Sequence, residues 1–118
     1  MERIASGGPF EAKIGYVRAV KADDWVHVAG TCAEGPDVVS QCKAALETIR
    51  GALEQAGAGF EHAVRVNYYL PNAGDFEPCW PVLSETFGAN PPVATMVECN
   101  LIDPKFLIEI ELTCYVGD

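Results

Sequence analysis

The chain has 118 residues, of which 49% are hydrophobic and 21% charged, and these values fit a single globular domain spanning residues 1–118. Its 17 acidic and 8 basic side chains give a formal net charge of −9, and an acidic surface repels nucleic acid and anionic membranes. No apolar run reaches the ~20 residues of a membrane span and no apolar secretion segment follows the first methionine, so we expect a cytoplasmic protein.

The first half of the chain predicts a β-hairpin followed by a helix. Residues 1–13 are rich in glycine and proline and predict an irregular arm. Branched and aromatic residues recur over 14–20 and 25–29, and the short polar segment between them is typical of a hairpin turn. Asp37 is a suitable N-cap, and the apolar residues after it recur at helical spacing, so a helix is expected from there to about residue 57 or 59.

The second half predicts a strand, a short helix and two more strands. Residues 63–70 are rich in β-forming side chains, and a helix should follow that begins at or after Pro78 or Pro81. Residues 93–99 and 106–116 are predicted to be strands. The predicted order is therefore ββαβαββ.

The crossover connections predict a mixed sheet with both helices on one face. In the last strand, Glu109 and Glu111 alternate with apolar residues, so one face packs on the helices and the other carries carboxylates. Five further side chains are assigned to the helix-free face: Val64, Val66, Tyr68, Ala94 and Met96. Apolar groups on an uncovered face favour a partner subunit, so we expect a homo-oligomer.

The C-terminal segment carries a recognisable signature. Residues 91–111 read PPVATMVECNLIDPKFLIEIE and keep the spacing of a Pro-x-Arg stretch followed by Glu-Ile-Glu. Together with the hairpin IGYVRAV…WVHVAGT and the segment DVVSQCKAALETIRGALEQAGAG, this segment resembles the Rid family of reactive-intermediate deaminases, also called YjgF. The resemblance covers almost the whole chain. It implies a homotrimer of ferredoxin-like α+β chains, similar to trimeric chorismate mutase, with clefts between subunits.

The resemblance also implies a reaction. Archetypal members hydrolyse imines and enamines to a keto acid and ammonia without a metal or cofactor, and the signature arginine binds the substrate carboxylate. Here that position is Ala94, so the chain resembles an arginine-lacking branch. Because a guanidinium offers a bidentate fork and alanine offers neither charge nor donor, carboxylate capture should differ from that of the archetype.

The substrate-binding residues that the resemblance and the strand alternation indicate are Tyr16, Arg18, His27, Ala29, Gly30, Trp80, Ala94, Thr95 and Met96. Ala29 stands where the archetype has a serine. Met96 stands where it often has a cysteine, and Trp80 where it often has an asparagine. Arg18 is the best cationic substitute for the missing arginine, or it forms a structural salt bridge to Glu11 or to a partner subunit. His27 could transfer protons near neutral pH, or it is simply hydrogen-bonded.

Two glutamates are the candidate catalytic residues. Glu111 is predicted to position or activate water, and Glu98 shares a strand face with Ala94 and Met96 and could lie near Glu111. Two carboxylates in a partly dry cleft repel each other, which raises at least one pKa toward a value suited to acid–base catalysis. Alternatively, each is solvated or paired with one of three cations: Arg18, Arg65 or Lys105.

The five cysteines contain no C-x-x-C pair, so we expect buried thiols, no disulfide framework and no metal site. The sequence thus predicts a homotrimeric, cofactor-independent imine or enamine hydrolase (deaminase) whose ligand is a small metabolite. The alternative is a non-catalytic, small-molecule-binding or regulatory trimer, which the loss of the arginine and the serine favours. RNA cleavage is disfavoured by the net charge.

Overall fold

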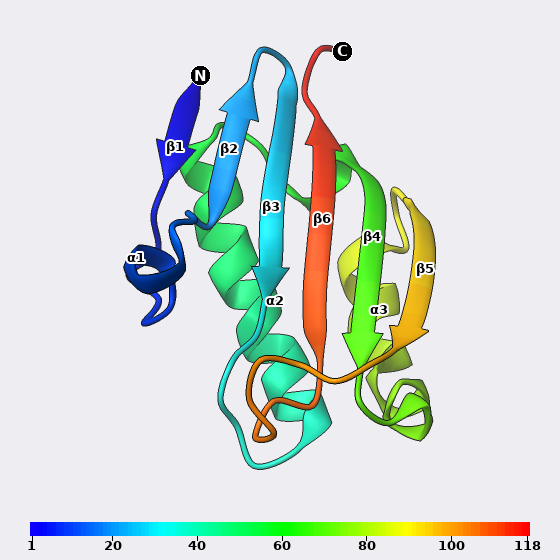
Figure 1. Cartoon of the computed structure of the whole chain (residues 1–118). Helices are drawn as coiled ribbons and strands as arrows, with labels where there is room; N and C mark the ends of the chain where they lie inside the picture. The colour runs from blue at the N-terminus through cyan, green and yellow to red at the C-terminus, as the bar shows by residue number, and fades with distance from the viewer.

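Six strands form one mixed sheet in the computed structural model, which describes residues 1–118 (Figure 1). The strands are β1 (Glu2–Ile4), β2 (Ala19–Ala22), β3 (Trp25–Thr31), β4 (Ala63–Leu70), β5 (Val93–Glu98) and β6 (Glu109–Tyr115). Their order across the sheet is β1-β2-β3-β6-β4-β5. Only β4 and β5 run parallel, and every other neighbouring pair is antiparallel.

Two helices cover one face of this sheet, as predicted (Figure 1). The helical elements are α1 (Glu11–Ile14), α2 (Val38–Gln55) and α3 (Trp80–Phe87), with 3₁₀ turns η1 (Phe60–His62), η2 (Ala73–Asp75) and η3 (Glu77–Cys79). The Asp37 carboxylate accepts a hydrogen bond from the Ser40 amide at 2.8 Å, which confirms the predicted N-cap of α2. No helix combines the length and the apolar character needed to cross a membrane.

The hydrophobic core lies between α2, α3 and one face of the sheet. Along β6, Ile110, Leu112 and Cys114 are buried, whereas the residues between them point to the helix-free face and are only half-buried. Ile49 and Leu53 of α2 complete the centre of the core. Each fully buried aliphatic side chain of this kind contributes about 1.5–3 kcal/mol, so the core stabilises the packing of the helices on one face of the sheet, and no helix covers the other face.

The N-terminal arm is more ordered than its glycine and proline content predicts. Residues Glu2–Ile4 pair with β2, and the short helix α1 ends at Gly15, whose φ of 93° lies in the left-handed region. The chain reverses there, so β2 begins at Ala19 rather than at residue 14. The prediction of an irregular arm therefore holds for residues 5–10 and was wrong for β1 and α1.

The face assigned to β4 and β5 was also wrong. Val66 and Tyr68 are buried on the helix side, where Tyr68 packs against Phe76 with ring centroids 5.0 Å apart. The parallel register places Ala94 beside Val66 and Met96 beside Tyr68, so both lie on this side too. Strand periodicity had indicated which residues share a face, but it could not indicate which face meets the helices.

Candidate active site

The helix-free face carries a row of polar side chains from the central strands. Glu109 and Glu111 of β6 both point to this face, because they alternate with the buried Ile110. On β4, Tyr69 pairs with Glu109 and Asn67 pairs with Glu111. The two glutamates therefore lie two residues apart on the same surface, and their surroundings decide their chemistry.

A β-bulge in β3 shapes the surroundings of Glu109. Val28 pairs with Leu112 but Thr31 pairs with Ile110, so one extra residue is inserted between them. Cys32 is thereby brought beside Glu109, and its thiol donates a hydrogen bond to Oε1 at 3.3 Å. A Cβ atom at Gly30 would lie 2.7 Å from Glu109 Oε2, so a side chain at this position would displace the carboxylate from its present place.

A cavity of about 420 Å³ opens next to Glu109, between the end of β3, the N-terminal arm and the loop before β6. Its polar lining includes Tyr16, Arg18, Cys32 and Glu109. The other residues that line it are Ser6, Gly7, Gly8, Pro9, Phe10, Ile14, Ala29, Gly30, Thr48, Ile102 and Phe106. Four of the predicted binding residues thus meet in one cavity, namely Tyr16, Arg18, Ala29 and Gly30.

Arg18 organises the wall of this cavity. It is 6% exposed, and Nη1 donates to the Gly30 carbonyl at 2.9 Å and to Thr31 Oγ1 at 3.0 Å. Nε donates to Ser6 Oγ at 3.1 Å, and Nη2 donates to the Tyr16 hydroxyl at 3.3 Å. The guanidinium therefore joins the N-terminal arm to the bulge, and its donors are directed at protein acceptors.

Glu11 balances the charge of Arg18. Its Oε2 lies 3.7 Å from Arg18 Nη2, and both side chains are 7% exposed. Burial by itself would raise the pKa of Glu11, but hydrogen bonds from Ser6 and Gly8 and the charge of Arg18 outweigh burial, so the pKa falls below its usual value. The structural salt bridge considered for Arg18 is therefore the arrangement that the structure contains.

The Cys32 thiol is a proton donor at neutral pH. Burial and the adjacent Glu109 carboxylate raise the pKa of this thiol to about 12, so it keeps its proton. Cys42, Cys79 and Cys114 are buried in the core, as predicted, whereas Cys32 and Cys99 are only half-buried. Cys32 thus holds the carboxylate in place and is not itself a nucleophile.

Glu111 lies outside the cavity. Its Oε1 accepts hydrogen bonds from Asn67 Nδ2 and from the Tyr69 hydroxyl, both at 2.9 Å. The hydrogen bond to Glu111, together with burial, raises the pKa of Tyr69. This carboxylate is held by two neutral donors within the sheet face and does not face the cavity.

The other predicted residues are dispersed. His27 is exposed on the helix-free face, and Thr95 lies on the same face opposite Asn67. Trp80 is exposed at the start of α3. Glu98 pairs with the buried Leu70, and its Oε2 accepts the Ala73 amide at 2.8 Å.

Within one chain, Glu98 therefore lies on the helix side of the sheet with Ala94 and Met96, whereas Glu111 lies on the helix-free face. The parallel pairing of β5 with β4 puts Glu98 on the side of Leu70, so the two glutamates do not meet within one chain, and their meeting in a cleft between subunits stays a prediction. No group of three or more His, Cys, Asp or Glu side chains is arranged to hold a metal ion.

Sequence reasoning missed Glu109 and Cys32. Both glutamates of Glu-Ile-Glu share a strand face, so periodicity alone could not distinguish them. The useful signal was Gly30, since a glycine inside a strand is typical of a bulge or of a close approach by another group. The partner that approaches Gly30 depends on the register shift, which the sequence does not display.

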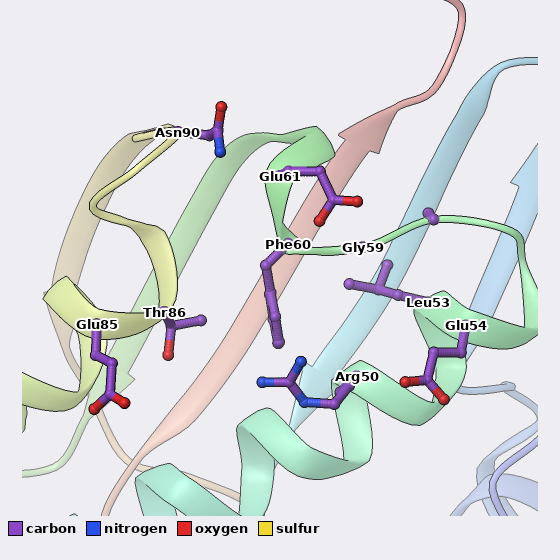
Figure 2. A pocket seen from close by; sticks show the side chains of 10 residues that line it. Arg50, Leu53, Glu54, Gly59, Phe60, Glu61, Glu85, Thr86 and Asn90 are labelled. Carbon is purple, nitrogen blue, oxygen red and sulfur yellow. The ribbon is translucent and has the colours of Figure 1, made fainter.

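A second cavity, of about 520 Å³, lies between α2, η1 and α3 (Figure 2). Figure 2 shows Arg50 beside the Phe60 ring, and the guanidinium carbon is 5.0 Å from the ring centroid. Glu54, Glu61 and Glu85 line this cavity and are exposed. None of the predicted binding residues lines it, and its carboxylates accept no hydrogen bond from a buried donor, so the Glu109 cavity is the better candidate.

The fold defines a class of protein: a small α+β chain with helices on one face of a mixed sheet and a polar, open second face. A model described as endoribonuclease L-PSP matches residues 8–116. A RutC family protein of Pyrococcus abyssi is 33% identical over 108 residues, which cover 85% of each chain. The chain therefore belongs to the endoribonuclease L-PSP, or YjgF, family, and the resemblance seen in the sequence is confirmed.

Solved structures agree with this assignment. A member of the YjgF/YER057c/UK114 family from Mycobacterium tuberculosis matches with a TM-score of 0.94 and 40% identity over 98% of each chain. RidA from a Psychrobacter species matches with a TM-score of 0.82 at 21% identity over 97% of this chain and 94% of that chain, a similarity that concerns the fold alone.

Proposed function

We propose that this protein is a cofactor-independent hydrolase of small imines and enamines, and that the reaction takes place in the cavity beside Glu109. The observation that carries the proposal is the placement of the Glu109 carboxylate, which Cys32 holds at Oε1 and which Gly30 accommodates at Oε2. A fixed carboxylate facing a cavity of mixed polar and apolar lining is suited to moving protons to and from water.

The chemistry requires one water and one group that carries a proton. Water attacks the carbon of the C=N bond, and Glu109 accepts a proton from that water. Glu109 then delivers this proton to the nitrogen of the resulting carbinolamine. The C–N bond breaks, ammonia leaves, and a carbonyl compound remains. An enamine first accepts a proton at carbon to become the imine. Positioned acid–base catalysis of this kind contributes about 10²–10⁴-fold in rate.

Three neighbours position the carboxylate and the cavity wall. Cys32 donates to Glu109, while Arg18 fixes both the Gly30 carbonyl and the Tyr16 hydroxyl. Because these groups are held before substrate arrives, little reorganisation is needed during the reaction. Tyr16 is then the wall residue whose hydroxyl and ring face the substrate.

The proposal is tested by competition between hydrolysis and trapping of an imine generated in situ. An oxidase supplies the imine, semicarbazide converts unhydrolysed imine to a semicarbazone, and the initial rate of semicarbazone formation is measured with and without the protein. We expect the protein to lower this rate at least tenfold, because hydrolysis removes the imine and the carbonyl product reacts more slowly with semicarbazide. A rate equal to that in buffer for every imine tried would reject the hydrolase.

Gly30→Ala should reduce this activity about 10²-fold, because the new methyl group would displace Glu109 and a misplacement of about 1 Å has an effect of this size. Gly51→Ala is the matched control. Gly51 lies in α2 with nothing within 4 Å of an added Cβ, so this change should leave activity unaltered and stabilise the helix by about 0.5–1 kcal/mol. Equal activity of the two variants would contradict the role of Gly30.

We also propose that the chain works as a homotrimer, with the helix-free face at the interface. Val93 and Val97 of β5 are 55% and 40% exposed, and Trp25 on the same sheet is 40% exposed. Large exposed apolar groups of this kind mark contact surfaces. Light scattering after gel filtration should give three times the chain mass of 12.7 kDa, and a single-chain mass at micromolar concentration would contradict the trimer.

A second candidate function is the binding of a metabolite without turnover. It is favoured by one observation, namely that four of the five N–H donors of Arg18 are directed at protein acceptors and Glu11 balances its charge, so the cavity holds no uncompensated cation for a substrate carboxylate. A ligand that binds wild type but is never consumed would support this alternative. Endoribonuclease activity, which the name of the matching family suggests, is opposed by the net charge of −9.

A further inference from the structure

The charge balance of the Glu109 cavity indicates which substrates it accepts. Arg18 is the one lysine or arginine that lines the cavity, and each nitrogen of its guanidinium donates to the protein. Glu11 lies 3.7 Å from it and compensates its charge. Four of the five guanidinium N–H groups are thus used by protein acceptors, and Glu11 balances the charge, so Arg18 offers a ligand carboxylate neither a bidentate fork nor a net positive charge.

Other cations do not compensate Glu109. Lys105 Nζ bonds to Glu34 at 2.6 Å and does not line the cavity. Arg65 pairs with Thr113, four residues from Glu109 along β6, which corresponds to about 13 Å of strand. The cavity thus presents one carboxylate and repels an anionic ligand.

The mouth of the cavity is apolar. Ile14 and Ile102 are 60% and 55% exposed, and both line the cavity. Phe10 and Phe106 add aromatic area to the same lining. An aliphatic or aromatic substituent on the ligand would cover these side chains, at about 25 cal/mol per Å² of apolar surface removed from water.

We infer that the substrate is a carboxylate-free iminium ion, R–CH=NH₂⁺, in which R is apolar. This inference rests on the proposed hydrolase function. The step is balanced as R–CH=NH₂⁺ plus H₂O giving R–CHO plus NH₄⁺. An enzymatic oxidation of a primary amine at its carbon–nitrogen bond is the class of reaction that supplies such an ion. The cationic nitrogen faces Glu109, and the apolar group lies against Ile14 and Ile102.

A matched pair of imines tests the inference. A flavin-dependent amine oxidase acting on 3-methylbutan-1-amine supplies the carboxylate-free imine, and an L-amino-acid oxidase acting on leucine supplies the same skeleton with a carboxylate. We expect kcat/KM for the first to exceed that for the second at least tenfold. A preference for the leucine-derived imine would overturn the inferred substrate class while leaving the hydrolase standing.

Binding separates the inference from the proposed function. 3-Methylbutan-1-amine, a cation at pH 7, should bind wild type at least tenfold more tightly than 3-methylbutanoate. Glu109→Gln should abolish this preference, whereas Glu54→Gln, which removes the same charge from the second cavity, should leave it intact. If neither imine is hydrolysed, the hydrolase proposal fails, and tighter binding of the carboxylate would overturn the inferred ligand charge.

Discussion

Replacing Arg18 with methionine is expected to lower the free energy of unfolding by about 3–5 kcal/mol, the usual effect of breaking a buried ion pair. Arg18 is 6% exposed and joins the N-terminal arm to the bulge of β3. Its loss would leave Glu11 buried without a counter-charge and the Gly30 carbonyl without its donor. Urea unfolding at fixed protein concentration measures the change.

A double variant distinguishes this cause from general damage. Glu11→Gln in the Arg18→Met background removes the uncompensated charge, so the double variant should be more stable than Arg18→Met alone. A single-variant change below about 1 kcal/mol would contradict the structural role given to Arg18.

Glu11 also predicts a pH dependence. Its pKa in the folded protein lies below the value of 4.5 that it has when unfolded, so its ionisation stabilises the fold above that pH. The stabilisation is lost as the pH falls through the folded-state pKa. Below pH 4.5, wild type should therefore lose stability more steeply than Glu11→Gln, and identical slopes would count against the assigned ion pair.

Glu109→Gln is expected to reduce kcat/KM for imine hydrolysis at least 10²-fold, with little change in stability. Glutamine keeps an oxygen that can accept the Cys32 hydrogen bond, so the variant removes the charge and the basicity while preserving the shape. The semicarbazide competition assay and thermal melting of the same preparations measure both quantities.

Glu111→Gln is the matched comparison, because its carboxylate lies two residues away on the same face. The glutamine oxygen would still accept hydrogen bonds from Asn67 and Tyr69, and the residue lies outside the cavity, so kcat/KM should fall less than tenfold. The opposite ranking of the two variants would restore Glu111 as the catalytic residue and would contradict the site described above.

Local sequence patterns predicted the elements of this fold but not all their orientations. The N-cap at Asp37 and the alternation along β6 rest on interactions within one element, and both were confirmed. The side of the sheet that β4 and β5 present to the helices depends on long-range packing, such as that of Tyr68 against Phe76. Residue periodicity shows which side chains share a strand face, but it does not show which face packs against the helices.

In the candidate site, too, local features were predicted and contacts between distant segments were not. Tyr16, Ala29 and Gly30 were predicted from the family resemblance and Arg18 as the substitute cation, and the structure brings all four to one cavity. The proposed role of Glu109 was not predicted, because it depends on a single inserted residue in β3 that brings Cys32 beside Glu109. A bulge of one residue changes which side chains of the two strands contact each other, and the sequence of β6 alone does not predict a bulge in β3.

An NMR titration of the ¹⁵N-labelled protein with 3-methylbutan-1-amine tests whether a small ligand binds in the cavity at Glu109. We expect the largest shifts at the amides of Tyr16, Gly30, Cys32 and Glu109. Shifts concentrated at Arg50 and Phe60 of the second cavity, or at Asn67 and Glu111 alone, would contradict this expectation.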